Sequence, residues 1–337
     1  MDDFWFRLPG PARMVDELCR DFRVGCNVYY TVPDELRPYI LSSFTEALSD
    51  NDLYSEIIDA GTEAAGDPFQ VLRQFVSQDR QSSLIRPSDI ATCDDLRFRL
   101  FVVYCDEQGR NPWNDFVRRY ADAVHTHNRG GHAVFCLVSS GEWKGVRDDV
   151  FIQVKRWSDY FTDYDCEIFA AHHRAYRKDT QWVGRLASSL VAGLAQGDPL
   201  LAEHLADLEL EALLSPDVML RECTGSGMVI PGIPIHTADN ITRRIWKAQV
   251  REVFPLLEEL RHDLLSQARR QLASLGSLRD KDVRELELGQ LNYYLRNTEW
   301  SDYARILADM RHKLAHLELI PYRDLQNALF ARRSSVF

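Results

Sequence analysis

Residues 96–107, LRFRLFVVYCDE, contain a continuous apolar run that ends at the acidic pair Asp106 and Glu107. Two similar β-branched and aromatic runs occur at residues 26–33, CNVYYTVP, and at residues 132–142, HAVFCLVSSGE. Two other segments have the apolar spacing of amphipathic helices. GPARMVDELCRDFRVG precedes the run at residues 26–33, and PWNDFVRRYADAVHTH lies between the runs at residues 96–107 and 132–142. Continuous apolar runs separated by helices are typical of parallel strands covered on both faces. We therefore expect an α/β domain with a parallel sheet over residues 1–154.

The rest of the chain has helical patterns. The segments WVGRLASSLVAGLAQ and PLLAEHLADLELEALL each predict an amphipathic helix, within a helical subdomain over residues 155–222. Residues 223–240, CTGSGMVIPGIPIHTADN, are rich in glycine, proline and small residues, which is typical of a linker. Three helical blocks follow and predict an all-α domain over residues 241–337. The expected breaks and caps are a kink or restart at Pro255, a capping box from Asp282 to Glu285, and an N-cap at Ser301.

The composition is that of a folded globular protein. The 337 residues are 45% hydrophobic and 11% aromatic, which excludes a disordered chain and suggests two or three domains. Charges interrupt every apolar stretch before it reaches the ~18 residues of a membrane span. The acidic start MDDFWFRLPG differs from a secretory signal, and the seven cysteines include no C-x-x-C pair. We therefore expect a cytoplasmic protein with reduced thiols and no membrane partner.

Charge is unevenly distributed along the chain. The net charge of −11 argues against nonspecific nucleic-acid binding by the whole molecule. Residues 240–337 contain 17 Lys and Arg against 13 Asp and Glu, a net charge of +4, which leaves −15 for the preceding residues. The basic part is therefore C-terminal. The excess of acidic residues before residue 240 is explained equally well by an acidic surface that only keeps the protein soluble.

The first domain resembles the core of P-loop ATPases of the AAA+ and STAND kinds in the order of its parts. In such ATPases an acidic pair after an apolar strand holds magnesium, which is the position of Asp106 and Glu107, and Ser139 follows the next strand where a polar sensor is found. The phosphate-binding pattern G-x-x-x-x-G-K-[ST] is missing, because NVYYTVPDELRP has no glycine or lysine and Pro33 lacks an N–H donor. We expect a degenerate, non-hydrolysing scaffold without a cofactor. A functional ATPase and an unrelated α/β domain are the alternatives.

The last helical block contains DMRHKLAHLELIP at residues 309–321, where Arg311, His312 and His316 form the pattern R-H-x-x-x-H. With the segments IWKAQVREVFPLLEELR and LELGQLNYYL, residues 241–329 resemble the HEPN superfamily (higher eukaryotes and prokaryotes nucleotide-binding domains). Its hallmark is Arg, a polar residue, three further residues and His. The resemblance implies metal-independent RNA cleavage, with Arg311 on the scissile phosphate, His316 as general acid or base, and His312 in a positioning or assisting role.

These residue types suit that reaction. A base must remove the 2′-OH proton, an acid must protonate the leaving 5′-oxygen, and a cation must stabilise the pentacoordinate phosphate. Histidine, with a pKa of ~6.5, supplies either proton transfer near neutral pH. Arginine presents a planar fork of donors to phosphate oxygens. Because the reaction needs a 2′-OH, RNA is the expected partner.

Helical geometry predicts that the three side chains do not form one cluster. In a regular helix Arg311 and His316 lie about 140° apart with a rise of ~7.5 Å, whereas His312 and His316 lie on one side. HEPN ribonucleases are generally dimers with a composite site. The resemblance therefore implies a homodimer through the C-terminal helices.

Simpler interpretations remain open. Arg311 and Lys313 also complement the negative end of a helix dipole, and the motif is compatible with a noncatalytic HEPN module or an accidental pattern. A zinc site at His312 and His316 has no evident third ligand, so no metal is expected. A second histidine cluster has no carboxylate or cysteine at ligand spacing and is expected to be structural: His125, His127 and His132.

Two hypotheses follow. The first is an RNA endonuclease that acts as a toxin or antiviral defence effector, regulated by its N-terminal domain or by partner proteins of a defence system. This biological context comes from the resemblance alone. The second is a noncatalytic adaptor that assembles a defence or nucleic-acid-processing complex. The missing phosphate loop favours the adaptor, and the intact R-H-x-x-x-H pattern favours the enzyme.

Overall fold

The computed structural model describes residues 3–61, 66–127, 130–177, 179–226, 236–275 and 282–334. Within them, contacts separate two compact units, one that ends at Thr162 and one that begins at Asp163. Residues 227–235 of the predicted linker lie outside the described residues. Its first residues belong to helix α11 (Pro216–Ser226), and helix α12 (Ala238–Gln267) begins before its predicted end.

The first unit contains a parallel sheet, which within the described residues has five strands in the order β2-β3-β4-β1-β5. The strands are β1 (Asn27–Thr31), β2 (Ser55–Asp59), β3 (Leu100–Tyr104), β4 (Val134–Ser139) and β5 (Ile152–Arg156). The three central strands, β3, β4 and β1, are the predicted apolar runs, and all their residues are buried. Cys136 pairs with Val28 on one side and Val102 on the other. The predicted α/β domain with a parallel sheet is confirmed.

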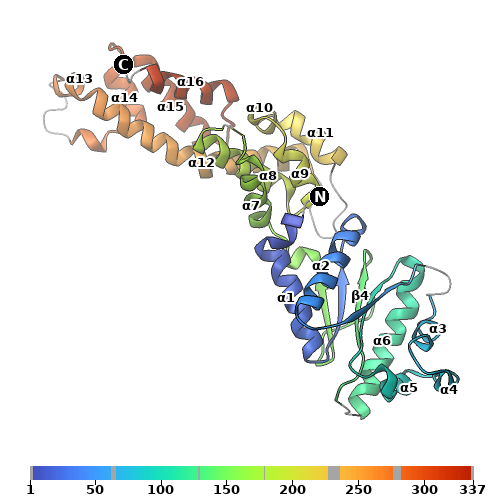
Figure 1. Cartoon of the computed structure of the whole chain (residues 1–337). Coiled ribbons are helices and arrows are strands. Elements are labelled where there is room, and N and C mark those ends of the chain that lie inside the picture. The colour runs from blue at the N-terminus through green and yellow to red at the C-terminus, as the bar shows by residue number, and fades with distance from the viewer. Residues whose placement is uncertain are drawn as a thin grey trace. The chain divides into compact units, whose positions relative to one another are not determined.

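Helices cover both faces of this sheet. Figure 1 shows α1 (Pro9–Arg23) and α2 (Arg37–Asp50) on one side and α6 (Glu107–His127) on the other. The short helices α3 (Pro68–Arg73), α4 (Gln78–Gln81) and α5 (Pro87–Ala91) lie on the α6 side. Side chains of the strands pack against the helices on both faces of the sheet. Tyr30 packs on Phe44 of α2 on one face, whereas Phe135 packs on Phe116 of α6 on the other. Burial on both faces explains why the central strands are apolar throughout.

The two edge strands differ from the pattern that the central strands follow. In β2 three of the five residues are exposed, and in β5 the buried residues are only Ile152 and Lys155. Edge strands pack on fewer neighbours, so their sequences, SEIID and IQVKR, lack a continuous apolar run. Because β5 extends to Arg156, the predicted domain boundary at residue 154 lies within a strand.

A charged network joins β5 to α1. Lys155 is 9% exposed, and its Nζ lies 2.5 Å from Asp21 and 3.2 Å from Glu17. Tyr160 donates a hydrogen bond of 2.5 Å to the same Glu17 carboxylate. A buried cation is tolerated when carboxylates pair with it, so this network accounts for a lysine on the inner side of an edge strand.

The second unit is helical, which confirms the predicted helical region. Besides α11 and α12 it contains α7 (Asp163–Arg174), α8 (Gln181–Ala195), α9 (Pro199–Ala206), α10 (Leu210–Leu213), α13 (Arg269–Ala273), α14 (Leu288–Leu295), α15 (Ser301–Ala315) and α16 (Tyr322–Ser334). The segment PLLAEHLADLELEALL forms α9 and α10, because the chain leaves the helix at Asp207.

Three predicted helix signals act differently in the structure. Pro255 lies inside α12, which neither ends nor restarts there. Ser301 is the first residue of α15, and the N-cap is Trp300, which makes no side-chain cap bond. Asp282 caps only a 3-10 turn at Val283–Glu285; the following α-helix begins at Leu288, where the backbone N–H of Glu287 donates to Gln290 Oε1 at 3.0 Å.

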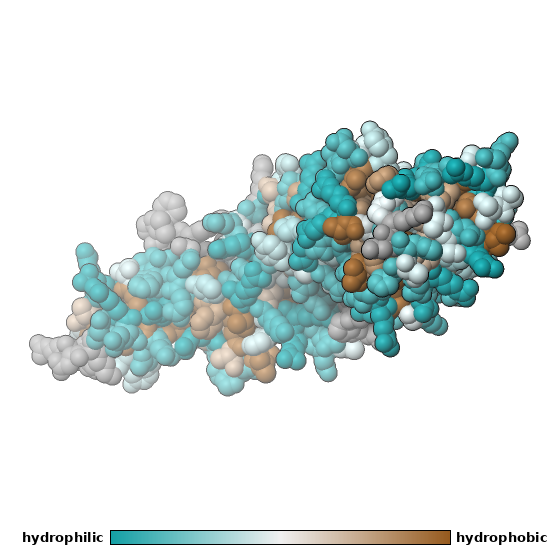
Figure 2. Space-filling view, turned by 90° about the horizontal axis from the view of Figure 1, so that it is seen from below, coloured by the Kyte–Doolittle hydropathy of each residue, from teal (hydrophilic) through white to brown (hydrophobic). Residues whose placement is uncertain are grey.

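The surface is mixed in character and most thiols are buried. On the face drawn in Figure 2, hydrophobic side chains occur in small groups among hydrophilic ones. Across the described ranges, no helix combines the length and apolarity that a membrane crossing requires. The seven cysteines are free thiols, and six of them are buried.

Candidate functional site

The motif histidines lie together at the end of α15. The ring centroids of His312 and His316 are 4.2 Å apart with an interplanar angle of 49°. Both side chains are exposed, and neither makes a hydrogen bond or ion pair with another side chain in the described part of the chain. The four-residue spacing therefore brings the imidazoles into contact, as helical geometry predicts.

The helix end beside these rings has a defined geometry. The His316 N–H donates to the carbonyl of His312 at 3.1 Å, and the Glu318 N–H donates to the carbonyl of Lys313 at 2.9 Å. Between them Leu317 has a φ of +61°. This is a Schellman end, in which the left-handed position, most often glycine, is occupied by leucine. The backbone at His316 is therefore fixed by hydrogen bonds.

A buried glutamine of α12 fixes the segment that follows the helix end. Gln249 is 0% exposed; its Nε2 donates to the carbonyl of Ile320 at 2.7 Å, and its Oε1 accepts from the Ile320 N–H at 2.9 Å. Trp246 Nε1 also donates to the carbonyl of Leu314 at 3.0 Å. Gln249 is not among the residues that the sequence pattern singles out, although it interrupts an apolar stripe four residues after Ile245 and four before Val253.

Arg311 is directed away from the histidine pair and towards α14. Its Nη1 lies 3.0 Å from Oε2 of Glu287, the residue before α14. Its side chain is 36% exposed, so this is a surface pair. The structure thus brings His312 and His316 together and holds Arg311 at a separate acidic partner. Nothing in the spacing of the motif indicates Glu287, which lies 24 residues earlier in the chain.

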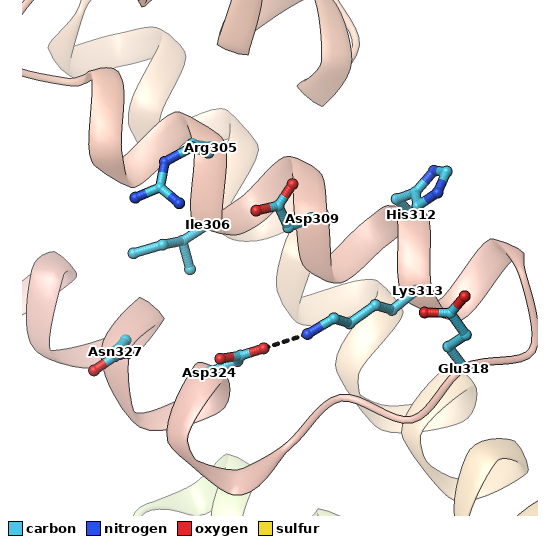
Figure 3. Close-up of a pocket in the computed structure, with 8 residues that line it drawn as sticks. All are labelled: Arg305, Ile306, Asp309, His312, Lys313, Glu318, Asp324 and Asn327. Carbon is cyan, nitrogen blue, oxygen red and sulfur yellow. Dashed lines mark hydrogen bonds and ion pairs between the residues drawn. The ribbon is translucent and has the colours of Figure 1, made fainter.

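A pocket of about 430 Å³ borders the motif between α15 and α16. Figure 3 shows Lys313 reaching across it to Asp324 of α16, an ion pair of 2.5 Å. Asp309, Glu318 and His312 also border it, and Figure 3 shows the His312 ring directed away from the Lys313–Asp324 pair. Lys313 thus links two helices, and like Arg311 it already has a carboxylate partner, whereas His312 and His316 have none among the described residues.

The acidic pair Asp106 and Glu107 lies in the first unit, at the carboxyl end of β3. Asp106 Oδ1 accepts hydrogen bonds from the backbone N–H groups of Gln108 at 3.0 Å and Gly109 at 2.7 Å. These bonds make Asp106 the N-cap of α6, which begins at Glu107 and contains Pro112 within its length. Glu107 is exposed. Ser139, by contrast, is 1% exposed, and its Oγ accepts from the Gly141 N–H at 3.3 Å.

The chain's own side chains form a network at the same carboxyl edge of the sheet. Arg37 of α2 forms an ion pair with Asp59 at the end of β2, and its Cζ lies 3.5 Å from the centroid of the Tyr104 ring. The Tyr104 hydroxyl donates to Asp34, and burial together with this carboxylate raises the tyrosine pKa well above its ordinary value. In open α/β sheets this edge is where ligands bind. Here Asp59 pairs with the Arg37 guanidinium, and Asp34 accepts from the Tyr104 hydroxyl.

The described residues contain no group of three or more His, Cys, Asp and Glu that could hold a metal ion. His125 and His127 end α6, and His132 Nε2 lies 2.8 Å from the carbonyl of Gly25.

No protein-family model matches this chain, and no curated protein matches it. The assignment of a function therefore depends on the residues and their geometry.

Proposed function

We propose that the chain is a metal-independent RNA endonuclease of the HEPN kind, in which Arg311 binds the scissile phosphate, His316 transfers a proton and His312 assists. The observation that carries the proposal is the exposed imidazole pair, with ring centroids 4.2 Å apart, that follows Arg311 at the end of α15. Neither ring is engaged by another described side chain, so both are available to a substrate.

Two proton transfers are needed for cleavage. One imidazole would accept the 2′-hydroxyl proton as that oxygen bonds to phosphorus, and a protonated imidazole would give its proton to the 5′-oxygen as the P–O5′ bond breaks. The products are a 2′,3′-cyclic phosphate and a 5′-hydroxyl. Arginine stabilises the additional negative charge on the phosphate oxygens at the transition state.

A homodimer would complete the site. Within one copy Arg311 pairs with Glu287, on a different side of α15 from the two histidines. Two copies that meet at the C-terminal ends of α15 would bring Arg311 close to His316 of the partner subunit. The exposure of both histidines and the partial exposure of Arg311 agree with such an interface.

The first unit would regulate this activity without hydrolysing a nucleotide. Asp106 is occupied as the cap of α6, and Arg37 pairs with Asp59 and lies over the Tyr104 ring at the sheet edge where a nucleotide would bind. A role as a toxin or antiviral defence effector, restrained by this unit or by a partner protein, follows from the resemblance to HEPN proteins.

The test is cleavage of total cellular RNA by the purified protein in the presence of EDTA. Cleavage by the wild type, with a loss of at least 100-fold in both Arg311→Ala and His316→Ala, is the expected result. Arg305→Ala, an exposed arginine on the same helix, is the matched control and should cleave normally. Cleavage that EDTA abolishes, or that survives both motif substitutions, would contradict the proposal.

A second candidate is a noncatalytic adaptor in a defence or nucleic-acid-processing complex. The ion pair between Arg311 and Glu287 favours it, because a neutralised arginine binds phosphate less strongly. A well-folded dimer that fails to cleave RNA, both as the wild type and as Glu287→Gln, would support the adaptor. The second substitution matters because it removes the carboxylate that neutralises Arg311.

A further inference from the structure

We infer that the end of α14 is a stacking platform for the bases of single-stranded RNA, formed by Tyr293, Tyr294 and Arg296. The inference rests on the proposed function for the identity of its ligand. It adds to the motif a surface that would hold the RNA strand next to the site of cleavage.

The platform consists of two aromatic rings and one cation. Tyr293 is 60% exposed, and its ring centroid lies 5.3 Å from that of Tyr294 at an interplanar angle of 78°. The guanidinium of Arg296 lies over the Tyr293 ring, with Cζ 4.9 Å from the centroid. Arg296 is exposed and forms no ion pair with the described residues, so its charge is available to a phosphate.

This arrangement distinguishes Tyr293 from other exposed tyrosines of the second unit. Tyr164 and Tyr176 are also exposed, at 63% and 86%. Among the described residues, neither has a cation over its ring, whereas Tyr293 does. An aromatic face beside an unpaired arginine is the combination that binds bases and backbone of single-stranded nucleic acids.

One member of the platform faces the same side of α14 as the partner of the motif arginine. Glu287, which pairs with Arg311, precedes α14, and Tyr294 follows seven residues later. In an α-helix a step of seven residues turns ~20° short of two full turns and rises ~10 Å, so half-buried Tyr294 is on the Glu287 side. The exposed ring of Tyr293 is ~100° further round the helix and contacts Tyr294. A strand that leaves Arg311 would therefore have to pass round α14 to reach Tyr293 and Arg296.

Charge supports a polyanion such as RNA over a neutral or basic protein as the occupant. Residues 240–337 have a net charge of +4, whereas the rest of the chain has −15. A polyanion is therefore attracted to this part of the chain more than to the remainder.

The experiment measures binding without cleavage. Full-length protein with His316→Ala is titrated against a fluorescein-labelled 12-nucleotide single-stranded RNA, and anisotropy reports the Kd. Adding Tyr293→Ala should weaken binding roughly tenfold, and Tyr293→Phe should preserve it, because stacking requires the ring and not the hydroxyl. Arg296→Gln should weaken binding and reduce the dependence of log Kd on log salt by about one unit. Tyr164→Ala is the matched control and should bind as the parent does.

Three outcomes would overturn the platform. Equal affinity of the Tyr293→Ala and parent proteins would do so even if the wild type cleaves RNA, and the proposed ribonuclease would then stand alone. Absence of RNA binding by the parent would also overturn it. A Tyr293→Ala protein that changes from dimer to monomer in analytical ultracentrifugation would identify the tyrosines as a contact between copies. Conversely, Tyr293-dependent binding by a wild type that never cleaves would support the platform and reject the ribonuclease.

Discussion

Arg311 and Glu287 form an ion pair of 3.0 Å that joins α15 to the start of α14. The glutamate side chain is 64% exposed, so solvent screens the pair and its contribution to folding is small. Its main effect is electrostatic, because a carboxylate neutralises the one arginine of the R-H-x-x-x-H motif. Glu287 thereby limits the affinity of Arg311 for a phosphate.

Replacing Glu287 with Gln is expected to tighten binding of single-stranded RNA about three- to tenfold at low salt. The substitution preserves the shape of the side chain and removes the charge that competes with phosphate for the guanidinium. Anisotropy titrations in the His316→Ala background measure the change in Kd. The free energy of unfolding should change by less than about 0.5 kcal/mol.

Glu285→Gln is the control for that experiment, because it makes the same change in net charge two residues earlier. An equal increase in affinity in both variants would mean that only the overall charge matters. Unchanged affinity in Glu287→Gln would show that Arg311 does not contact the RNA.

Asp106 offers a test of what the acidic pair after β3 does. As the cap of α6 it should tolerate Asn, whose side-chain oxygen also caps helices, whereas Asp106→Ala should destabilise the protein by about 1 kcal/mol. Differential scanning fluorimetry with and without magnesium and ATP reports both effects. A rise in the melting temperature of the wild type with magnesium and ATP, absent in Asp106→Asn, would indicate instead a working nucleotide site.

The network of Glu17, Lys155 and Tyr160 predicts a pH dependence of stability. Burial by itself raises the pKa of Glu17, but hydrogen bonds from Tyr160 and Lys155 outweigh it and hold the pKa below the ordinary 4.5. A lowered folded-state pKa means that the carboxylate stabilises the fold above pH 4.5 and that this contribution is lost as the pH falls through the folded-state pKa.

The wild type should therefore melt at a higher temperature than Glu17→Gln at pH 7, and the difference should shrink as the pH falls below 4.5. Melting curves of both proteins across this range measure it. The same substitution at exposed Glu46 is the control for the removal of one negative charge from the surface of this unit. A constant gap for Glu17→Gln would mean that its carboxylate does not titrate differently in the folded state.

The sequence predicts the centre of the sheet well and its edges poorly. β1, β3 and β4 are buried on both faces, so their apolar runs are continuous and visible. β2 and β5 are stabilised from one side by backbone pairing with neighbours distant in sequence, which no local pattern reports. For Pro255 the predicted restart does not occur, because α12 continues through a residue that cannot donate to the preceding turn.

For the candidate site, local geometry was predictable and long-range partners were not. The contact between His312 and His316 depends only on helical rise and rotation, and the structure confirms it. Glu287 and Gln249 reach the site from other helices, and their positions depend on how α14 and α12 pack against α15. Whether the motif catalyses RNA cleavage stays a prediction.

Leu317 should be a strained residue whose replacement stabilises the fold. Its φ of +61° lies in the left-handed region, which costs a residue with a Cβ ~1–2 kcal/mol, and at 67% exposure its side chain buries little area in return. After the loss of ~0.5–1 kcal/mol from the greater backbone freedom of glycine, Leu317→Gly should stabilise the protein by about 0.5–1 kcal/mol. Ala315→Gly, two residues earlier at the last residue of α15, should instead destabilise it by about 0.5 kcal/mol. Urea unfolding of the two variants should thus shift in opposite directions, and a shift of both to lower urea would show that Leu317 makes a stabilising contact that outweighs its backbone strain.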